Sequence, residues 1–104
     1  MATQDNTVKV GEGGNRFVPP TLTVAAGTPV HWVVVGQAHT VTSNGNPDAN
    51  VECTPHSAEN FSSGEMDPGD PNTSTFDHTF NTTGSFSYHC EIHGCGMKGT
   101  INVI

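Results

Sequence analysis

The stretch of sequence that decides the fold reads Tyr88-His89-Cys90-Glu91-Ile92-His93-Gly94-Cys95-Gly96-Met97-Lys98-Gly99. Within it, Cys90, His93 and Met97 supply a thiolate, an imidazole and a thioether from one short loop. A second imidazole, that of His39, lies far upstream and has to reach the loop from another part of the fold. Two histidines, one cysteine and a weak axial methionine form the trigonal site of blue-copper electron-transfer proteins. These residue types therefore indicate a copper site, because thiolate suits Cu(I) and imidazole suits Cu(II).

The loop resembles the copper loop of the cupredoxins, the plastocyanin and azurin family of type 1 copper proteins. Four other segments resemble parts of that family in the same order along the chain, namely residues 17–27, 30–34, 39–43 and 98–103. The resemblance implies a small soluble electron carrier with one type 1 copper ion held by His39, Cys90, His93 and Met97. It also implies an all-β fold, a Greek-key sandwich of two sheets with about seven to eight strands. Electrons would leave through the edge of His93, so a redox protein partner is expected to dock near it.

The loop departs from the family pattern in two places. Three residues separate His93 from Met97, where plastocyanin usually has four and many bacterial relatives have two. Loop length governs how Met97 approaches the metal, so this spacing bears on the axial bond. The second departure is Cys95, which the usual loop lacks.

The two remaining cysteines suggest a disulfide. If Cys90 binds the metal, Cys53 and Cys95 are left, which is the number that one bridge needs. Such a bridge would tie a polar insert at about residues 44–60 to the copper loop, and an oxidising compartment would permit it. The insert also contains Cys53-Thr54-Pro55-His56, which looks like a second copper loop but has no methionine at short range. We interpret Cys53 as structural, and a second metal site with Cys53 and His56 is the alternative.

Length and charge narrow the class of partner. The chain of 104 residues is expected to form one domain, spanning residues 1–104. Three Lys and Arg against ten Asp and Glu give a net charge of −7, which disfavours nucleic acid or an anionic membrane and favours a basic or neutral partner. Six of the ten carboxylates fall between residues 48 and 70, as either a solvated surface or a docking patch. No run of about 18 apolar residues occurs, so we expect no membrane span, and we expect a monomer.

The first residues show no export signal, since residues 1–6 lack a basic start and an apolar segment. The resembled family is normally found outside the cytoplasm. We therefore expect an extracytoplasmic protein, periplasmic or at the cell surface, whose leader or tether is absent from this sequence. A cytosolic start is the alternative.

Alternating apolar residues predict short strands at residues 7–10, 30–35, from residue 39 onward, 74–80, 85–90 and at the C-terminus. Residues 17–24 lead through two prolines, which belong at the start or edge of a strand, into an alternating stretch at residues 21–24. Residues 30–35 are apolar on both faces, which predicts a strand buried on both sides. Trp32 is expected in the core, and His31 faces the opposite way. In residues 85–90, Cys90 and its alternate neighbours point to the core, whereas His89 projects away and is a poor ligand candidate.

Three other functions would use similar residues. A copper chaperone or storage domain of an extracytoplasmic copper pathway would bind the metal with soft ligands but release it readily to a chelator. A fragment of a multicopper oxidase or nitrite reductase would need further histidine clusters. We see neither these nor an acid–base pair, so we expect no enzyme. A zinc site would combine Cys90, His93, His39 and Cys95, and it would be colourless and closed to redox chemistry.

Overall fold

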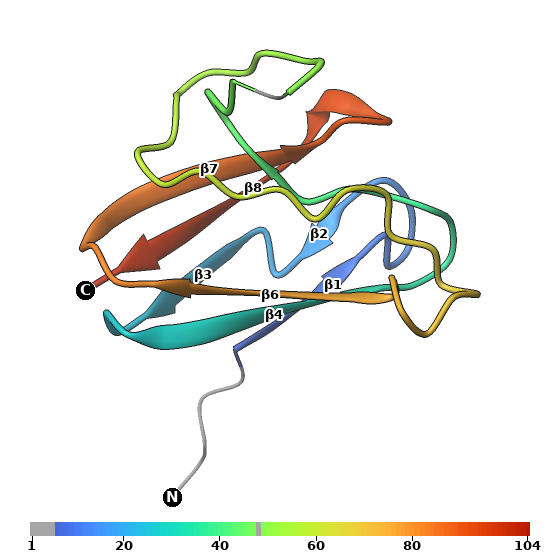
Figure 1. Ribbon diagram of the computed structural model, residues 1–104, viewed down its shortest axis with the longest axis horizontal. Helices are drawn as coiled ribbons and strands as arrows, with labels where there is room; N and C mark the ends of the chain where they lie inside the picture. The colour runs from blue at the N-terminus through green and yellow to red at the C-terminus, as the bar shows by residue number, and fades with distance from the viewer. Residues whose placement is uncertain (1–5, 48) are drawn as a thin grey trace, which may run out of the picture.

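The computed structural model describes residues 6–47 and 49–104. These residues form eight β-strands and no helix (Figure 1). The strands are β1 (Thr7–Val10), β2 (Phe17–Val18), β3 (Thr21–Val24), β4 (Thr28–Val34), β5 (Thr42–Ser43), β6 (Thr75–Phe80), β7 (Gly84–Cys90) and β8 (Gly94–Val103). They build two four-stranded sheets, in the orders β2-β1-β4-β6 and β3-β8-β7-β5. The expected all-β, two-sheet sandwich is confirmed, and the described part of the chain contains no helix that could cross a membrane.

Both sheets are mixed. β1 runs parallel to β4 and β3 runs parallel to β8, whereas the remaining neighbours are antiparallel. The segment at residues 17–24 is divided at Pro19 and Pro20, so that β2 pairs in the first sheet and β3 in the second. Proline has no N–H to donate to a sheet ladder, so the pair of prolines marks the point where the chain changes sheets.

The core lies between the sheets and is centred on Trp32, which is fully buried. Its indole lies 5.5–6.3 Å from the rings of Tyr88, Phe76, Phe61 and Phe80, distances at which aromatic side chains pack favourably. The position of Trp32 in the core is therefore confirmed.

The prediction that residues 30–35 are buried on both faces is wrong. In β4, Val30, Trp32 and Val34 are buried, whereas His31 is exposed and Val33 is half-buried. One face of this sheet covers the core and the other meets solvent. A β-branched valine is common in strands on either face, so apolar character alone did not distinguish the two.

The insert at residues 44–60 contains no strand in its described part, and it lies next to the end of β7 and the start of β8 (Figure 1). Its placement explains the burial of His89, whose predicted direction away from the core did not determine its exposure. Alternation along β7 is as expected, since Phe86, Tyr88 and Cys90 are buried, but His89 is fully buried as well. The insert covers this outer face of β7, so a side chain that points away from the core still avoids solvent.

Candidate metal centre

Three of the expected ligands converge at one end of the sandwich. Single donor atoms of His39, Cys90 and His93 all lie within 4.8 Å of one another. The Nδ1 atoms of the two histidines are 3.1 Å apart, and Sγ of Cys90 lies 3.8 Å from Nδ1 of His39 and 3.5 Å from Nδ1 of His93. Three donors around one ion with bonds of about 2.0–2.3 Å would be separated by roughly 3.5–3.8 Å in a plane. The two sulfur–nitrogen separations lie in this range and the nitrogen–nitrogen separation is a few tenths of an ångström shorter, so the donor set fits a single ion.

His39 lies after the loop that follows β4, and it is almost fully buried. It does not begin a regular strand, as the sequence suggested, but forms an isolated bridge with Met66, and β5 starts only at Thr42. Two backbone hydrogen bonds make this bridge, from His39 N–H to the Met66 carbonyl (3.1 Å) and from Met66 N–H to the His39 carbonyl (2.7 Å). The backbone of the ligand is thus held before any metal arrives.

Gly11 lies against the Nε2 side of the His39 ring, away from the Nδ1 atom that faces the other ligands. A Cβ atom at Gly11 would lie 2.5 Å from Nε2 of His39 and 2.6 Å from the carbonyl oxygen of Val35, and the φ of Gly11 is +90°. Only glycine adopts this conformation and allows so close an approach without strain. The turn after β1 therefore forms the back wall of the His39 side chain.

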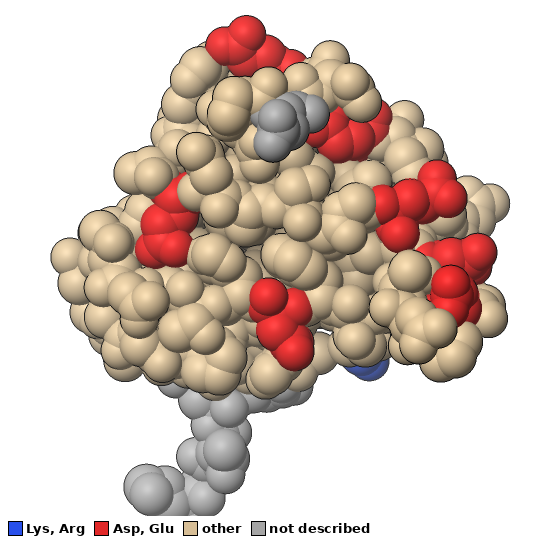
Figure 2. All heavy atoms as spheres, viewed as in Figure 1, with Lys and Arg blue, Asp and Glu red and all other residues tan. Residues whose placement is uncertain are grey.

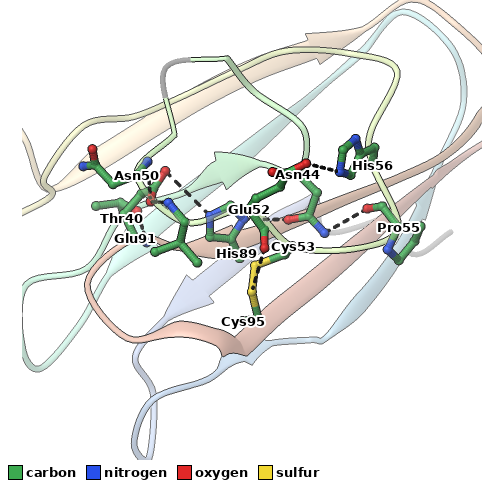
Figure 3. Close-up of a disulfide and its surroundings, with 11 residues drawn as sticks. Thr40, Asn44, Asn50, Glu52, Cys53, Pro55, His56, His89, Glu91 and Cys95 are labelled. Atoms are coloured by element: carbon green, nitrogen blue, oxygen red, sulfur yellow. Dashed lines mark hydrogen bonds and ion pairs between the residues drawn. A yellow bond between two sulfur atoms is a disulfide. The ribbon is translucent and has the colours of Figure 1, made fainter.

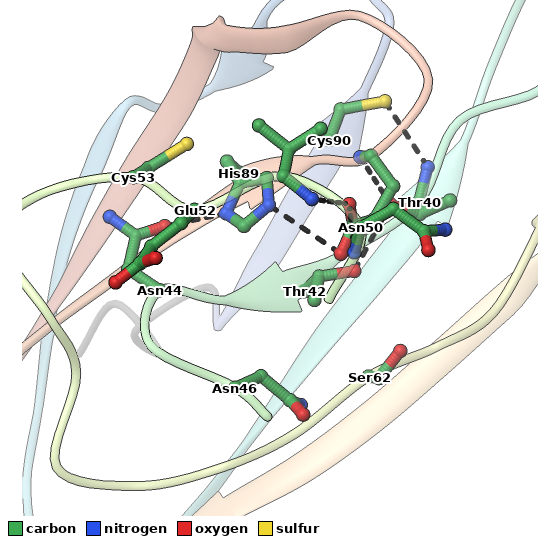
Figure 4. Close-up of polar contacts among 12 residues, drawn as sticks. Thr40, Thr42, Asn44, Asn46, Asn50, Glu52, Cys53, Ser62, His89 and Cys90 are labelled. Atoms are coloured by element: carbon green, nitrogen blue, oxygen red, sulfur yellow. Dashed lines mark hydrogen bonds and ion pairs between the residues drawn. The ribbon is translucent and has the colours of Figure 1, made fainter. Parts of the chain in front are cut away.

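Cys90 ends β7 and is fully buried. The backbone N–H of Thr40 donates a hydrogen bond to its sulfur at 3.4 Å (Figure 4). The hydroxyl of Thr40 accepts a hydrogen bond from the N–H of Glu91 at 2.7 Å. Thr40 thereby joins the segment of His39 to the segment of Cys90, and its N–H stabilises negative charge on the sulfur.

His93 and Met97 follow in the hairpin between β7 and β8. His93 is half-buried, and Met97 is almost fully buried. The register pairs Cys90 with Gly94 and His89 with Lys98, with an irregularity between the two pairs. Met97 therefore lies in the irregular end of the hairpin that carries Cys90 and His93, with its side chain directed into the protein.

Burial affects the acid–base state of the centre. It lowers the pKa of His39 below its ordinary value, and the neighbouring imidazole of His93 lowers it further. A lowered pKa keeps the imidazole neutral near pH 7. The ring nitrogen then has a free lone pair, which is what a metal ion requires.

The disulfide between Cys53 and Cys95 is confirmed, with a Cα–Cα distance of 5.7 Å (Figure 3). Because these two sulfurs are bonded to each other, the alternatives of a zinc site with Cys95 and a second metal site with Cys53 are wrong. His56 instead lies 3.0 Å from the carboxylate of Glu52 on the surface. Among the described residues, no second group of metal-binding side chains occurs.

A buried polar network beside the centre was missed by the sequence reasoning. The Nδ1–H of His89 donates to Oδ1 of Asn44 at 2.6 Å, and Nδ2 of Asn44 donates to the carbonyl of Pro55 at 3.0 Å (Figure 3). Glu91 accepts backbone N–H bonds from Asn50 at 3.1 Å and Val51 at 2.9 Å. The only signal in the sequence was Glu91, a carboxylate directly after the metal-binding Cys90 at the end of a buried strand.

The fold and the donor set define the class of protein as a cupredoxin, and comparison with known proteins identifies the family. A family model described as copper binding proteins, plastocyanin/azurin family, matches residues 4–104. The chain is 37% identical over 106 residues to plastocyanin from Scenedesmus fuscus, covering 95% of this chain and 99% of that protein. It is 36% identical over 102 residues to chloroplastic plastocyanin from Physcomitrium patens, covering 93% of this chain and 56% of that protein.

Solved structures agree. The oxidised form of plastocyanin from Dryopteris crassirhizoma superimposes with a TM-score of 0.70 at 27% identity, over 94% of this chain and 99% of that one. The chain belongs to the plastocyanin/azurin family of copper-binding proteins. It is a plastocyanin-like cupredoxin, and its candidate type 1 copper site consists of His39, Cys90, His93 and Met97.

Proposed function

We propose that the protein is an electron carrier and not an enzyme, with one copper ion bound by His39, Cys90 and His93 and, axially, by Met97. The observation that carries the proposal is the convergence of three donor atoms at separations of 3.1–3.8 Å around a buried cysteine. Copper would supply the one-electron couple. Residues 1–104 would form a single domain with a polar insert at about residues 44–60.

The chain itself would keep rearrangement small during electron transfer. His39 is held by its bridge to Met66, and Cys90 is held at the end of β7 by the N–H of Thr40. Ligands that are fixed by the backbone change position little when the charge of the metal changes. An electron carrier needs ligands that stay in place, whereas a chaperone has to release its metal.

The half-buried edge of His93 is the proposed exit for electrons. Its neighbours Ile92, Gly94 and Gly96 are uncharged, and Ile92 is 48% exposed. A redox protein could therefore approach this edge closely, without the cost of removing water from charged groups. The net charge of −7 favours a basic or neutral partner, and the protein would act as a monomer.

The Cys53–Cys95 disulfide supports an extracytoplasmic location, in the periplasm or at the cell surface. Disulfides form and persist in oxidising compartments, whereas the reducing systems of the cytoplasm usually remove them.

The proposal is tested by the visible and EPR spectra after one equivalent of Cu(II) is added. The expected result is an intense thiolate-to-copper band with narrow copper hyperfine splitting. Cys90→Ser should abolish the band, because the thiolate is its source. His56→Ala, which removes an exposed imidazole outside the centre, is the matched control and should leave the spectrum unchanged. A weak, ordinary cupric spectrum of the unaltered protein would overturn the proposal and favour the chaperone or storage function.

A further inference from the structure

We propose that residues 50–53 of the insert form a brace for the copper loop (residues 90–97), and that Glu91 is a positioning residue that acts through this brace on His93. The inference rests on the proposed function, because it takes His93 as a ligand. It concerns residues to which the ligand set assigns no role.

The brace contacts the copper loop on both sides of His93. Glu91 lies two residues before His93, and its Oε2 accepts the N–H groups of Asn50 and Val51 at 3.1 and 2.9 Å. Cys95 lies two residues after His93, and it is bonded to Cys53. Both flanks of His93 are therefore attached to one segment of four residues. Figure 3 shows the contacts of Glu91 and Cys95 with this segment.

The contact made by Glu91 is a strong one. Its side chain is only 13% exposed, and Oε1 lies 3.6 Å from Nε2 of the buried His89. Hydrogen bonds to an ionised carboxylate are shorter and roughly twice as strong as those between neutral groups. The backbone N–H of Glu91 also donates to Thr40, whose own N–H donates to the sulfur of Cys90. Glu91 thus connects the brace with the segments that carry His39 and Cys90.

The brace is itself anchored to the sandwich. Asn44 follows β5 directly, and its side chain spans from His89 on β7 to the carbonyl of Pro55, just after the brace. Cys53 is buried, with 4% of its surface exposed. The brace is therefore joined to the sandwich through Pro55, two residues after Cys53, and through the burial of Cys53.

The copper loop needs such support because of its own composition. His93 is followed by Gly94, which has a φ of +75°, and Gly96 lies further along. Glycine loses more conformational freedom on ordering than any other residue. The loop would be mobile in the metal-free protein unless another segment supported it. The brace would keep His93 in place before copper binds and slow the loss of copper afterwards.

The first test is amide hydrogen exchange in the metal-free protein. We compare the unaltered chain with Glu91→Ala, with Cys53→Ala/Cys95→Ala and with the variant that carries all three substitutions. Amides of residues 92–96 should exchange about tenfold faster in each of the first two variants, while residues 100–103 of β8 stay unchanged. Because the two anchors hold one loop, the combined variant should exceed the product of the separate effects.

Glu52→Ala is the matched control. Like Glu91→Ala, it removes one carboxylate, but this one belongs to the brace. The side chain of Glu52 is 76% exposed and pairs with His56 instead of the loop. Exchange at residues 92–96 should remain as in the unaltered protein. If the cysteine variant folds poorly, the disulfide of the unaltered chain can be reduced with a phosphine, and folding is followed by circular dichroism. If exchange at residues 92–96 is unchanged in the Glu91 and cysteine variants, or rises equally throughout the sheets, the proposal that the brace holds the loop is wrong.

The second test measures copper release to a chelator and the EPR spectrum. Glu91→Ala should release copper about tenfold faster, and Glu91→Gln, which retains one acceptor oxygen, should recover part of the difference. Unchanged release in Glu91→Ala overturns the positioning role. If the unaltered protein lacks a type 1 spectrum, the proposed function fails and the link to copper fails with it. The exchange experiment is independent of copper and still decides whether the brace holds the loop.

Discussion

Gly11 is the residue whose contribution to the centre is least apparent, because it contributes no side chain. Its backbone lies against the ring of His39, and it has a positive φ. The ligand therefore depends on a turn that lies 28 residues earlier in the chain. Gly11, which has no side chain, thus helps to position the imidazole of His39.

Gly11→Ala should weaken copper binding, because a Cβ atom would lie 2.5 Å from Nε2 of His39 and would have to displace the ring. Gly14→Ala is the matched control. Gly14 has a φ of +136°, but a Cβ there would meet nothing within 4 Å. Both variants carry the cost of a positive φ, about 1 kcal/mol or more, so only the contact with His39 differs. Copper titration followed by visible absorption should show a broadened or absent band for Gly11→Ala alone. Equal spectra would contradict the wall formed by Gly11.

Met97 is the residue that we propose as the axial ligand. Met97→Leu conserves volume in a buried position, so the fold should be retained at a cost below about 1.5 kcal/mol. The colour should remain, and the reduction potential should rise, because a weak electron-donating ligand is lost. Voltammetry and the visible spectrum together measure both effects. A variant with neither a changed spectrum nor a changed potential would show that Met97 is not axial.

At the scale of elements, the β7–β8 hairpin fixes the geometry of the loop. The register places Tyr88 opposite Gly99, and a Cβ at Gly99 would lie 2.4 Å from the hydroxyl oxygen of Tyr88. Tyr88 is fully buried, and burial raises its pKa. The large ring thus occupies space that only a glycine on the neighbouring strand leaves free.

Gly99→Ala should destabilise the metal-free protein by about 1–3 kcal/mol, since a core side chain would have to move. Gly96→Ala is the control within the same strand, because a Cβ there meets nothing within 4 Å. Its free energy of unfolding should stay within about 0.5 kcal/mol of the unaltered chain. Denaturant unfolding measures both. Equal stability of the two variants would contradict the close packing of Tyr88 on Gly99.

At the scale of the whole molecule, the negative charge is distributed over the surface. Figure 2 shows carboxylates in several separate groups on the viewed face. Among the six carboxylates between residues 48 and 70, Glu59 is paired inside the protein. It lies 2.7 Å from Nε2 of His78, and both side chains are largely buried. Under the proposed function, the remaining acidic groups would attract a basic partner at long range, and the uncharged surface around His93 would make the close contact.

The stability of the metal-free protein should depend on pH through His39. Its pKa is lowered in the folded state, so the unfolded chain binds a proton more readily below the ordinary pKa of about 6.5. The stabilisation is fully present above that value and is lost as pH falls toward the lowered pKa. Unfolding at pH 7.5 and 5.5 should therefore show a loss of stability that is smaller in His39→Asn. An equal loss in both proteins would contradict the lowered pKa, which NMR titration of the ring measures directly.

The sequence alone determined the sandwich, the ligand candidates and the pairing of the cysteines. Alternation along residues 85–90 placed Cys90 in the core correctly, and spacing along the loop brought Cys90 near His93, because both depend on local chain geometry. Cys53 and Cys95 could be paired by counting, since only one cysteine is needed for the metal.

Only the tertiary structure decided what covers each face and what touches each ligand. Alternation predicted the direction of His89 but not its burial, because burial depends on where the insert lies, and the same period occurs on covered and on open faces. The contacts of Gly11 with His39 and of Glu91 with residues 50–51 join segments that are distant in the chain. No local pattern encodes such contacts, since they arise from the packing of the two sheets and the path of the insert across them.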